Sequence, residues 1–466
     1  MSSMKGLNVA LSALQAHQRA IEIAGQNIAN ANTKGYTRQR VNLAAAGAPV
    51  TPAIWSTSRV GGDGVQIVSI DRLNDTFLTQ RALQEHAADA SMQRTQQILA
   101  QVEQNFGEPG DNGIAAQLNE FWAGWQDVAN QPGNEASRTQ LLQRSETLAA
   151  TIRKVDSDLS RLHDETIEEI GTQVTQINSM AKQISGLNNS IQTATLNGLN
   201  PNDLADQRDN LIAKLATMAG ATIKPADNGA VDVYLGGTAL VRGATANELA
   251  APTTDAAGNV TIAWKLDNYP VDLTGGELAA LRQAVNVTLS KGTTGGVDGY
   301  RKKLDDVANA LRDQVNAQHA LGSDLQSPEQ AGGIFFTGTG ASDLGVNPAL
   351  LSNPNLVAAA KPGSGRLDGS NALAMSDLAD PVGSPDRIYQ ALVVGLGVEA
   401  DTANRRAQIQ ADVVNEADAA RESASGVNLD EELTNLVGYQ HAYAAAARVM
   451  NAVDQALDVL INRTGA

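Results

Sequence analysis

The two ends of the chain carry large apolar residues at a heptad spacing. Near the start, the stripe consists of Leu7, Leu11, Leu14, Ile21 and Ile28. Near the end, it consists of Leu429, Leu433, Leu436, Tyr443, Met450, Val453, Leu457 and Leu460. A stripe of this period stays on one side of an α-helix and has to be covered by another helix. The pattern therefore predicts two terminal helices that need partners, and it favours an assembly subunit over an enzyme.

The terminal stripes could also close a helical hairpin inside one monomer. Smaller or polar residues interrupt them at Gln18, Gly25, Gln440 and Ala447. Isolated short helices are marginal in water, and a hairpin of two such helices buries little apolar surface. We therefore expect the stripe residues named above to form an assembly interface with neighbouring copies.

A polar segment follows the first predicted helix and reads Asn27-Ile-Ala-Asn30-Ala-Asn-Thr33-Lys-Gly35-Tyr36. By itself, this segment is typical of a helix C-cap with Gly35 in the left-handed conformation. Such a cap would set the angle at which the chain leaves the first helix. The combination of Asn27, Asn30, Thr33, Gly35 and Tyr36 also resembles the N-terminal signature of bacterial flagellar axial proteins.

Further stretches extend this resemblance along the chain. They are Tyr36-Thr-Arg-Gln-Arg-Val41, Asp203-Leu-Ala-Asp-Gln-Arg-Asp209, Asn316-Ala-Gln-His319, and Ser425 to Glu432 running into Tyr439 to Tyr443. Together they resemble the flagellar hook-associated protein 1 family, which joins hook to filament. The resemblance spans residues 1–215 and about 275–466.

The resemblance implies a structural subunit that self-assembles into a helical tube around the export channel. It implies the hook protein and hook-associated protein 3 as neighbours, and a flagellar export chaperone as a partner before assembly. We expect this chaperone to bind the last helix through Leu436, Tyr443, Met450, Val453 and Leu457. The resemblance also implies an extracellular location in the flagellum, reached through the flagellar secretion apparatus without a cleaved signal peptide.

Composition and charge exclude several other classes. The net charge of −17 argues against a nucleic-acid partner, whose footprint would be a basic face. No apolar run is long enough to span a bilayer, so no membrane insertion is expected. The absence of cysteine excludes disulfides and thiolate metal sites. Residues 1–40 are net positive and residues 429–466 are net negative, which favours pairing of the two terminal helices.

The sequence predicts a mainly α-helical chain with a small β insertion. Between Pro132 and Pro201 there is no proline, and apolar residues step by three and four from Leu148 to Ile191, which predicts a long helical rod. Alternating apolar residues, as in Val231 to Leu235, predict the β insertion.

The resemblance arranges these elements as nested, elongated domains. The expected parts are a coiled-coil-like inner domain (1–35 and 429–466), a helical rod domain (36–217 and 276–428) with a β-hairpin near 55–70, and a β-rich outer domain (218–275). We expect the outer domain to have a core of its own, since the period of the apolar pattern changes at its boundaries.

No group of residues indicates a catalytic, cofactor or metal site. The five histidines lie far apart, without the spacing of metal ligands. The group Asp203, Asp206, Arg208 and Asp209 could serve catalysis, but it more simply predicts a helix cap and salt bridges. We therefore expect no enzyme activity, no cofactor and no metal.

Two alternatives stay open at this stage. Another flagellar axial protein, from hook or rod, would share the N-terminal signature, although the Arg208 cluster and the long shaft speak against it. From a different class, a cell-surface adhesin or a cell-wall hydrolase could be equally long and acidic. A hydrolase would need a carboxylate pair in the β insertion, where Asp232 and Asp267 have no motif around them.

Overall fold

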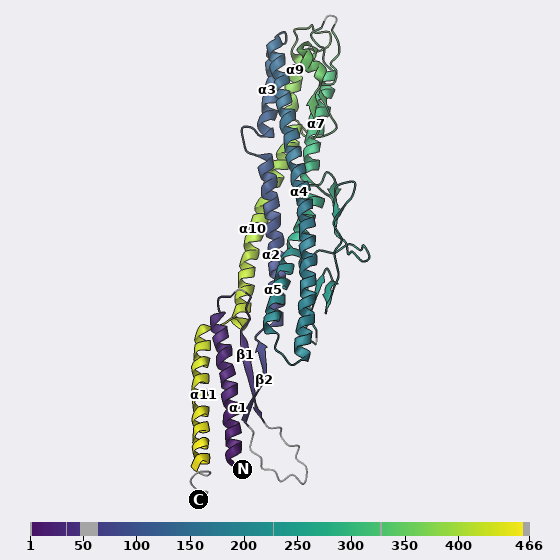
Figure 1. Cartoon of the computed structure of the whole chain (residues 1–466). Helices are drawn as coiled ribbons and strands as arrows, with labels where there is room; N and C mark the ends of the chain where they lie inside the picture. The colour runs from purple at the N-terminus through teal and green to yellow at the C-terminus, as the bar shows by residue number, and fades with distance from the viewer. Residues whose placement is uncertain (1, 34, 47–63, 227, 327–328, 460–466) are drawn as a thin grey trace.

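The longest element of the chain is helix α4, Glu135–Leu196, with 62 residues. The Asn134 side chain accepts a hydrogen bond from the Ala136 N–H and so caps its start. At 1.5 Å per residue, a helix of this length spans roughly 90 Å. The computed structural model, which describes residues 2–33, 35–46, 64–226, 228–326 and 329–459, is accordingly elongated (Figure 1). The predicted helical rod is confirmed.

Four helices form the lower and middle part of the shaft. They are α2 (Thr76–Phe106), α4, α5 (Asn202–Ala219) and α10 (Pro385–Ser425). Helix α10 runs beside α2 along the shaft (Figure 1). Among the described helices, none is both long and apolar enough to cross a membrane.

The upper end of the shaft has its own aromatic core. Its helices are α3 (Ile114–Asn130), α7 (Tyr300–Ala320), α8 (Pro348–Ser352) and α9 (Ser370–Ser376), with the short strand pair β11 (Phe336–Thr337) and β12 (Gly345–Val346). Phe121, Trp125, Phe335 and Phe336 are fully buried there, with ring centroids 5.0 to 6.4 Å apart. The pair β9 (Thr293–Thr294) and β10 (Val297–Asp298) lies instead against the π-helical turn at Ala284–Thr288.

The β insertion lies on one side of the shaft (Figure 1). It contains an antiparallel sheet of β3 (Thr222–Pro225), β4 (Val231–Leu235), β5 (Thr238–Arg242) and β6 (Thr245–Ala246), and the pair β7 (Thr253–Thr254) and β8 (Val260–Thr261). Helix α6 (Gly276–Gln283) and a π-helical turn (Ala284–Thr288) follow it. The fold class, mainly α with a small β insertion, is confirmed.

The expectation of a separate core for this insertion is wrong. Val233 and Leu240 from the sheet share one continuous apolar core with Ile177 and Ile184 of α4. The buried Asn188 of α4 also bonds to the sheet, donating to the Val231 carbonyl at 2.9 Å. The change of sequence period therefore marks a change of secondary structure but not a boundary between cores.

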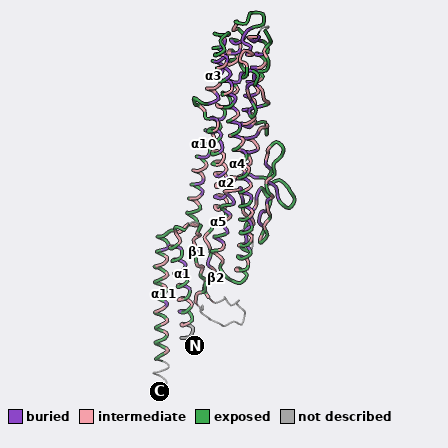
Figure 2. Tube along the Cα trace, turned by 45° about the horizontal axis from the view of Figure 1, so that its top comes forward, coloured by how far each residue is buried: buried purple, intermediate pink, exposed green. Residues whose placement is uncertain are grey.

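The terminal helices form a separate lower part, which we call the terminal pair. Helix α1 (Ser2–Ala29) and helix α11 (Leu429–Asp458) lie side by side and antiparallel (Figure 1). As predicted, Asn428 caps α11, accepting from the N–H groups of Asp430 and Glu431. Figure 2 shows that buried residues concentrate in the shaft, whereas most of the terminal pair is exposed or half-buried.

A two-stranded ribbon runs beside α1. Its strands β1 (Gln39–Ala46) and β2 (Gly64–Arg72) are antiparallel, with a bulge at Asn42 and Leu43. The hairpin was expected near residues 55–70, so only its second strand overlaps the expected position. Residues 47–63 lie outside the described part of the chain.

Candidate assembly surface and joint

The terminal pair is held together mainly by small residues. A Cβ added to Gly6 would lie 3.6 Å from Val453, and the rings of His17 and Tyr439 stack with centroids 6.4 Å apart. The buried positions of α1 are Ala10, Ala16, Ala20, Ile23, Ala24 and Asn27. These residues allow α11 on one side and the ribbon on the other to approach α1 closely.

The predicted stripe of α1 lies at the edge of this contact. Leu7, Leu14, Ile21 and Ile28 are half-buried, and Leu11 is 42% exposed. The apolar period thus locates the helix correctly, but most of the fully buried positions of α1 are alanines that the heptad does not select.

The predicted stripe of α11 divides into two sets. Leu436, Met450, Val453 and Leu457 are half-buried and lie on the side that faces α1. Leu429 and Leu433 are 46% and 49% exposed, and Tyr443 is 39% exposed. Leu460 lies outside the described residues. In the monomer, α1 therefore covers part of the stripe, and the role of these residues in assembly and chaperone binding stays a prediction.

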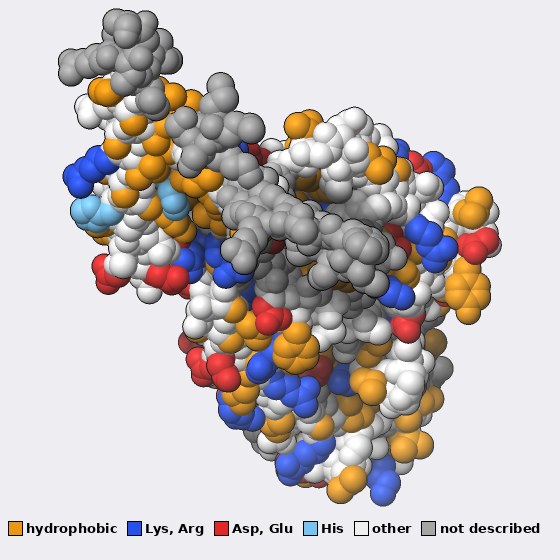
Figure 3. All heavy atoms as spheres, turned by 90° about the horizontal axis from the view of Figure 1, so that it is seen from below, with side chains coloured by type: hydrophobic (Ala, Val, Ile, Leu, Met, Phe, Trp, Pro, Cys, Tyr) orange, Lys and Arg blue, Asp and Glu red, His pale blue; other side chains and the backbone are white. Residues whose placement is uncertain are grey.

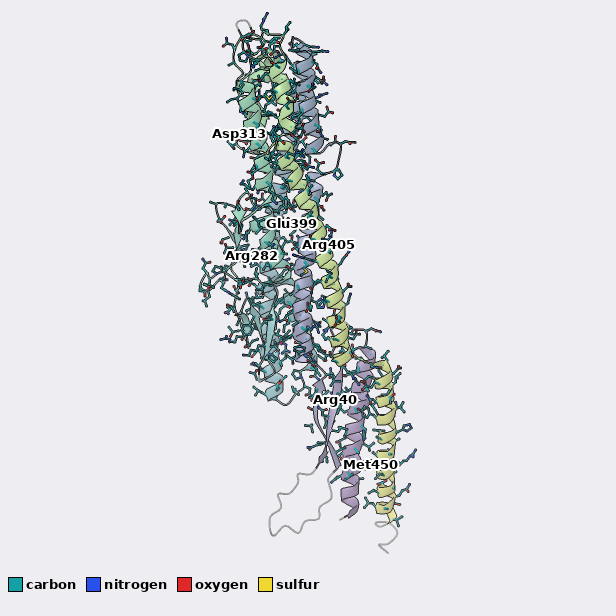
Figure 4. All side chains as sticks on the ribbon, turned by 180° about the vertical axis from the view of Figure 1, so that it is seen from behind. Arg40, Arg282, Asp313, Glu399, Arg405 and Met450 are labelled. Carbon is teal, nitrogen blue, oxygen red and sulfur yellow. The ribbon has the colours of Figure 1, made fainter. Side chains whose placement is uncertain are left out.

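The exposed residues define what we call the outer face of α11, made up of Leu429, Leu433, Val437 and Tyr443. Val437, which the heptad missed, is 50% exposed and continues the four-residue spacing of Leu429 and Leu433. Figure 3, seen from below, shows hydrophobic side chains gathered along the terminal pair. In Figure 4, Met450 lies in the half of α11 that points away from the shaft, and Arg40 lies near the start of β1, close to the shaft.

Where the terminal pair meets the shaft, Asn27 uses its full hydrogen-bonding capacity. Its Oδ1 accepts from the Tyr36 hydroxyl at 2.8 Å and from the Gln39 N–H at 3.0 Å. Its Nδ2 donates to the Gln39 carbonyl at 2.8 Å and to the Glu432 carboxylate at 3.0 Å. A side-chain amide offers two donors and two acceptor sites, so none is left unpaired. We call this region the joint.

Arg38 clamps the first turn of α11 at the joint. Its Nε donates to Glu432 at 2.7 Å, and its Nη1 donates to Glu431 at 3.0 Å. The Glu432 side chain is 4% exposed and the Glu431 side chain is 55% exposed. The bond from Arg38 lowers the pKa of the Glu431 carboxyl. Opposite charges at the two termini thus meet, as the sequence predicts.

A second arginine clamps the ribbon to the shaft. Arg72, at the end of β2, contacts Asp206 of α5 at 2.9 Å and also pairs with Asp209. Asp206 accepts from the Thr37 N–H at 3.3 Å. Burial raises the pKa of Asp206, and Arg72 opposes that rise. The salt bridges predicted for this cluster are present, but the predicted cap is wrong, since Pro201 occupies the N-cap position without a side-chain bond.

Gly35 has a different role from the one expected. Its φ of +84° is left-handed, as predicted, but α1 ends at Ala29, so Gly35 is not the C-cap. A Cβ at this position would lie 2.0 Å from the Asn210 side chain of α5. The glycine therefore allows the turn to approach the shaft.

The preceding turn is closed by Thr33, whose hydroxyl donates to Asn30 at 3.1 Å. Burial, followed by nearby carboxylates, raises the pKa of Tyr36 to about 12. Tyr36 therefore remains a hydrogen-bond donor at neutral pH.

The stretch Asn316 to His319 lies in the upper core, away from the joint. The Asn316 side chain accepts from the N–H groups of Phe335 and Phe336, both at 2.8 Å. His319 Nε2 accepts from the Ala358 N–H at 2.9 Å, and burial lowers the pKa of His319 to about 4. Within the part of the chain that the structure describes, no group of three potential ligands could hold a metal ion.

Terminal helices paired at one end of a long helical shaft, with their signature residues in the joint, define a flagellar axial protein. Residues 7–37 match the family of flagella basal body rod proteins, and residues 420–463 match the flagellar basal body rod FlgEFG protein C-terminal family. Residues 99–336 match the flagellar hook-associated protein FlgK helical domain.

Relatives that match the full length of the chain show which kind of flagellar axial protein it is. Flagellar hook-associated protein 1 of Bacillus subtilis is 30% identical, over 100% of this chain and 99% of the relative. The Escherichia coli protein of the same name is 27% identical, over 99% of this chain and 100% of that protein. The structure of the hook junction protein FlgK from Burkholderia pseudomallei has a similar fold, with a TM-score of 0.62 at 19% identity, covering 75% of this chain and 100% of that one.

The chain therefore belongs to the flagellar hook-associated protein 1 family, and it is a structural subunit of the hook–filament junction of the bacterial flagellum. The resemblance seen in the sequence is confirmed. The alternatives of a hook or rod protein, an adhesin or a cell-wall hydrolase have no support from these relatives.

Proposed function

We propose that the outer face of α11, with the exposed edge of α1, is the surface through which copies assemble into a helical tube around the export channel. The observation that carries this proposal is the exposure of Leu429, Leu433 and Val437 on one side of a helix. Each of these side chains is about half exposed, so covering the rest contributes about half of the ~1.5–3 kcal/mol of a full burial. Contacts between different faces of identical subunits build helical assemblies.

The neighbours in this proposal are the hook protein on one side and hook-associated protein 3 on the other. The inner domain would comprise residues 1–35 and 429–466, with the rod (36–217 and 276–428) and the β insertion (218–275) further out. The position of both terminal helices at one end of the molecule supports this order (Figure 1). The subunit has a structural and not an enzymatic role.

A flagellar export chaperone would bind α11 before assembly, and the chain would be exported without a cleaved signal peptide. Since Leu436, Met450, Val453 and Leu457 lie against α1, a chaperone that binds this face has to separate the two helices. Tyr443 is 39% exposed, so a chaperone can reach it while the two helices are still paired.

The junction role is tested in the bacterium that makes this chain. Deleting its gene should leave hooks without attached filaments and release filament subunits into the medium, and the wild-type gene should restore attachment. Normal filaments on the deletion strain would contradict the proposal.

The chaperone's binding mode has a separate test. Hydrogen exchange of the purified chain is compared with and without the candidate export chaperone of the same bacterium. Residues 436–457 should become protected while α1 exchanges faster. Simultaneous protection of both helices would contradict the separation of the pair.

A further inference from the structure

The terminal pair and the ribbon together are linked to the shaft by two short chain segments, which meet at one residue. One link, residues 73–75, connects β2 to α2, and the other, residues 426–428, connects α10 to α11. The Arg38 N–H donates to the carbonyl of Ser425, the last residue of α10, at 3.3 Å. The Arg38 carbonyl accepts from the Leu73 N–H at 2.8 Å. The backbone of Arg38 is thus bonded to the borders of both links.

The side chain of the same residue fixes α11. The guanidinium group contacts two consecutive carboxylates through separate nitrogens, with Nη2 at 2.8 Å from Glu431 and Nε at 2.7 Å from Glu432. The Arg38 side chain is only 14% exposed, so its contact with the buried Glu432 is weakly screened by solvent. A planar guanidinium group can make this forked contact, whereas a lysine ammonium group cannot.

The ribbon next to Arg38 is anchored independently. Asn202 of α5 donates to the Gln39 side chain and to the Ile70 carbonyl, both at 3.0 Å, and Arg72 pairs with Asp206. The start of β1 is therefore fixed to the shaft without help from the Arg38 side chain. By contrast, the first turn of α11 reaches this anchored ribbon through Arg38 and Asn27.

We propose that Arg38 is a positioning residue, which fixes the inclination of the terminal pair to the shaft. The two parts then behave as one rigid unit, and the terminal pair of every copy is presented at the same angle. Without the forked contact, the pair stays folded and α1 keeps its packing on the ribbon, but the first turn of α11 is released and the inclination of the pair to the shaft varies. The consequence for assembly rests on the proposed function, whereas the rigidity of the monomer does not.

The chain contains no cysteine, so spin labels can be introduced without removing native thiols. One label pair, at S179C on α4 and N451C on α11, reports the angle between shaft and terminal pair; both positions are exposed. A second label pair, at Q15C on α1 and N451C, reports the integrity of the terminal pair. Distances are measured in the full-length chain by pulsed electron paramagnetic resonance.

With Arg38 intact, both label pairs should give one narrow distance distribution. Arg38→Gln should broaden the distribution of the first pair about twofold and leave the second unchanged. Arg38→Lys should behave like Arg38→Gln, because it keeps the charge but loses the fork. Arg40→Gln is the matched control, since Arg40 is exposed and lies two residues further along; it should change neither distribution.

An unchanged first distribution in Arg38→Gln would overturn the proposal, even if the outer face is needed for assembly. Broadening of both distributions would also overturn it, because Arg38 would then be required for the folding of the terminal pair itself. The proposed function fails separately, if the junction forms normally without this chain.

Discussion

The side-chain amide of Asn27 donates a hydrogen bond to the carboxylate of Glu432 at 3.0 Å and so joins two residues 405 positions apart in the chain. Both side chains are almost completely buried. Each is an integral part of a different signature stretch, one near the start and one near the end. The joint therefore requires both ends of the chain to be in place at once.

Replacing Asn27 should weaken the terminal pair and not the shaft. Asn27→Ala leaves the Tyr36 hydroxyl without its acceptor and leaves the Glu432 carboxylate with Arg38 alone, and we expect a loss of about 2–4 kcal/mol in the local stability of α1 and α11. Hydrogen exchange of the two helices measures this loss. Asn30→Ala, whose side chain bonds only within its own turn, is the control. An equal loss in α4 would contradict a local role.

The free monomer should open first at its ends. Ile23 is the only large apolar side chain of α1 that is fully buried among its described residues, and the buried positions of α11 are Glu432 and Ala446. Exchange should therefore be fast in residues 1–30 and 435–466 and slow from Leu148 to Ile191. Uniform protection across the three segments would be incompatible with a terminal pair that lacks its covering surface.

The β insertion should contribute directly to the stability of the shaft. Leu240 is fully buried in the core that the sheet shares with α4, so Leu240→Ala should lower the free energy of unfolding of the shaft by about 2–5 kcal/mol. Leu266→Ala, in the same insertion but 91% exposed, should change it by less than about 0.5 kcal/mol. Unfolding followed by circular dichroism of the helices gives both values. Identical shaft stability in the two variants would indicate separate cores.

The upper core should be sensitive to acid through His319. Its pKa is lowered to about 4 by burial, whereas the ordinary value is 6.5. Between these values the unfolded chain binds a proton that the folded chain does not bind, so the stabilisation is complete above pH 6.5 and decreases as the pH falls towards 4. The largest possible loss is about 3 kcal/mol.

His319→Gln removes this titration. The variant should be less stable than the wild type at pH 7, and the difference should shrink as the pH falls to 5. Parallel stability profiles of the two proteins over this range would exclude His319 as the titrating group.

The sequence predicts the helices well because their signals are local. The long α4 follows from apolar residues at three- and four-residue steps without proline, and the start of α11 follows from Asn428. Which element packs on each face of a helix depends on tertiary contacts, and the spacing of apolar residues in the sequence carries no information about these contacts. Ala20 and Ala24 of α1 are fully buried, although the heptad selects Ile21 and Ile28.

The joint is the part of the structure that the sequence predicts least well. Its residues stand out as motifs, but their pairing across the chain does not follow from spacing. Arg72 had no signal at all, and it became recognisable only when the fold placed it against Asp206. The shared core of shaft and β insertion was missed for a similar reason, because alternation identifies strands but not the surface on which they pack.

The central claim, assembly through the outer face of α11, is tested most directly by the double variant Leu433→Asp and Val437→Asp. Both side chains are exposed in the monomer, so its thermal unfolding and its secretion should match the wild type. Val398→Asp and Ile409→Asp, at exposed positions of α10, form the matched control. Electron microscopy of cells should show hooks without filaments for the outer-face variant and attached filaments for the control. Attached filaments on cells that secrete the outer-face variant at wild-type level would contradict the account.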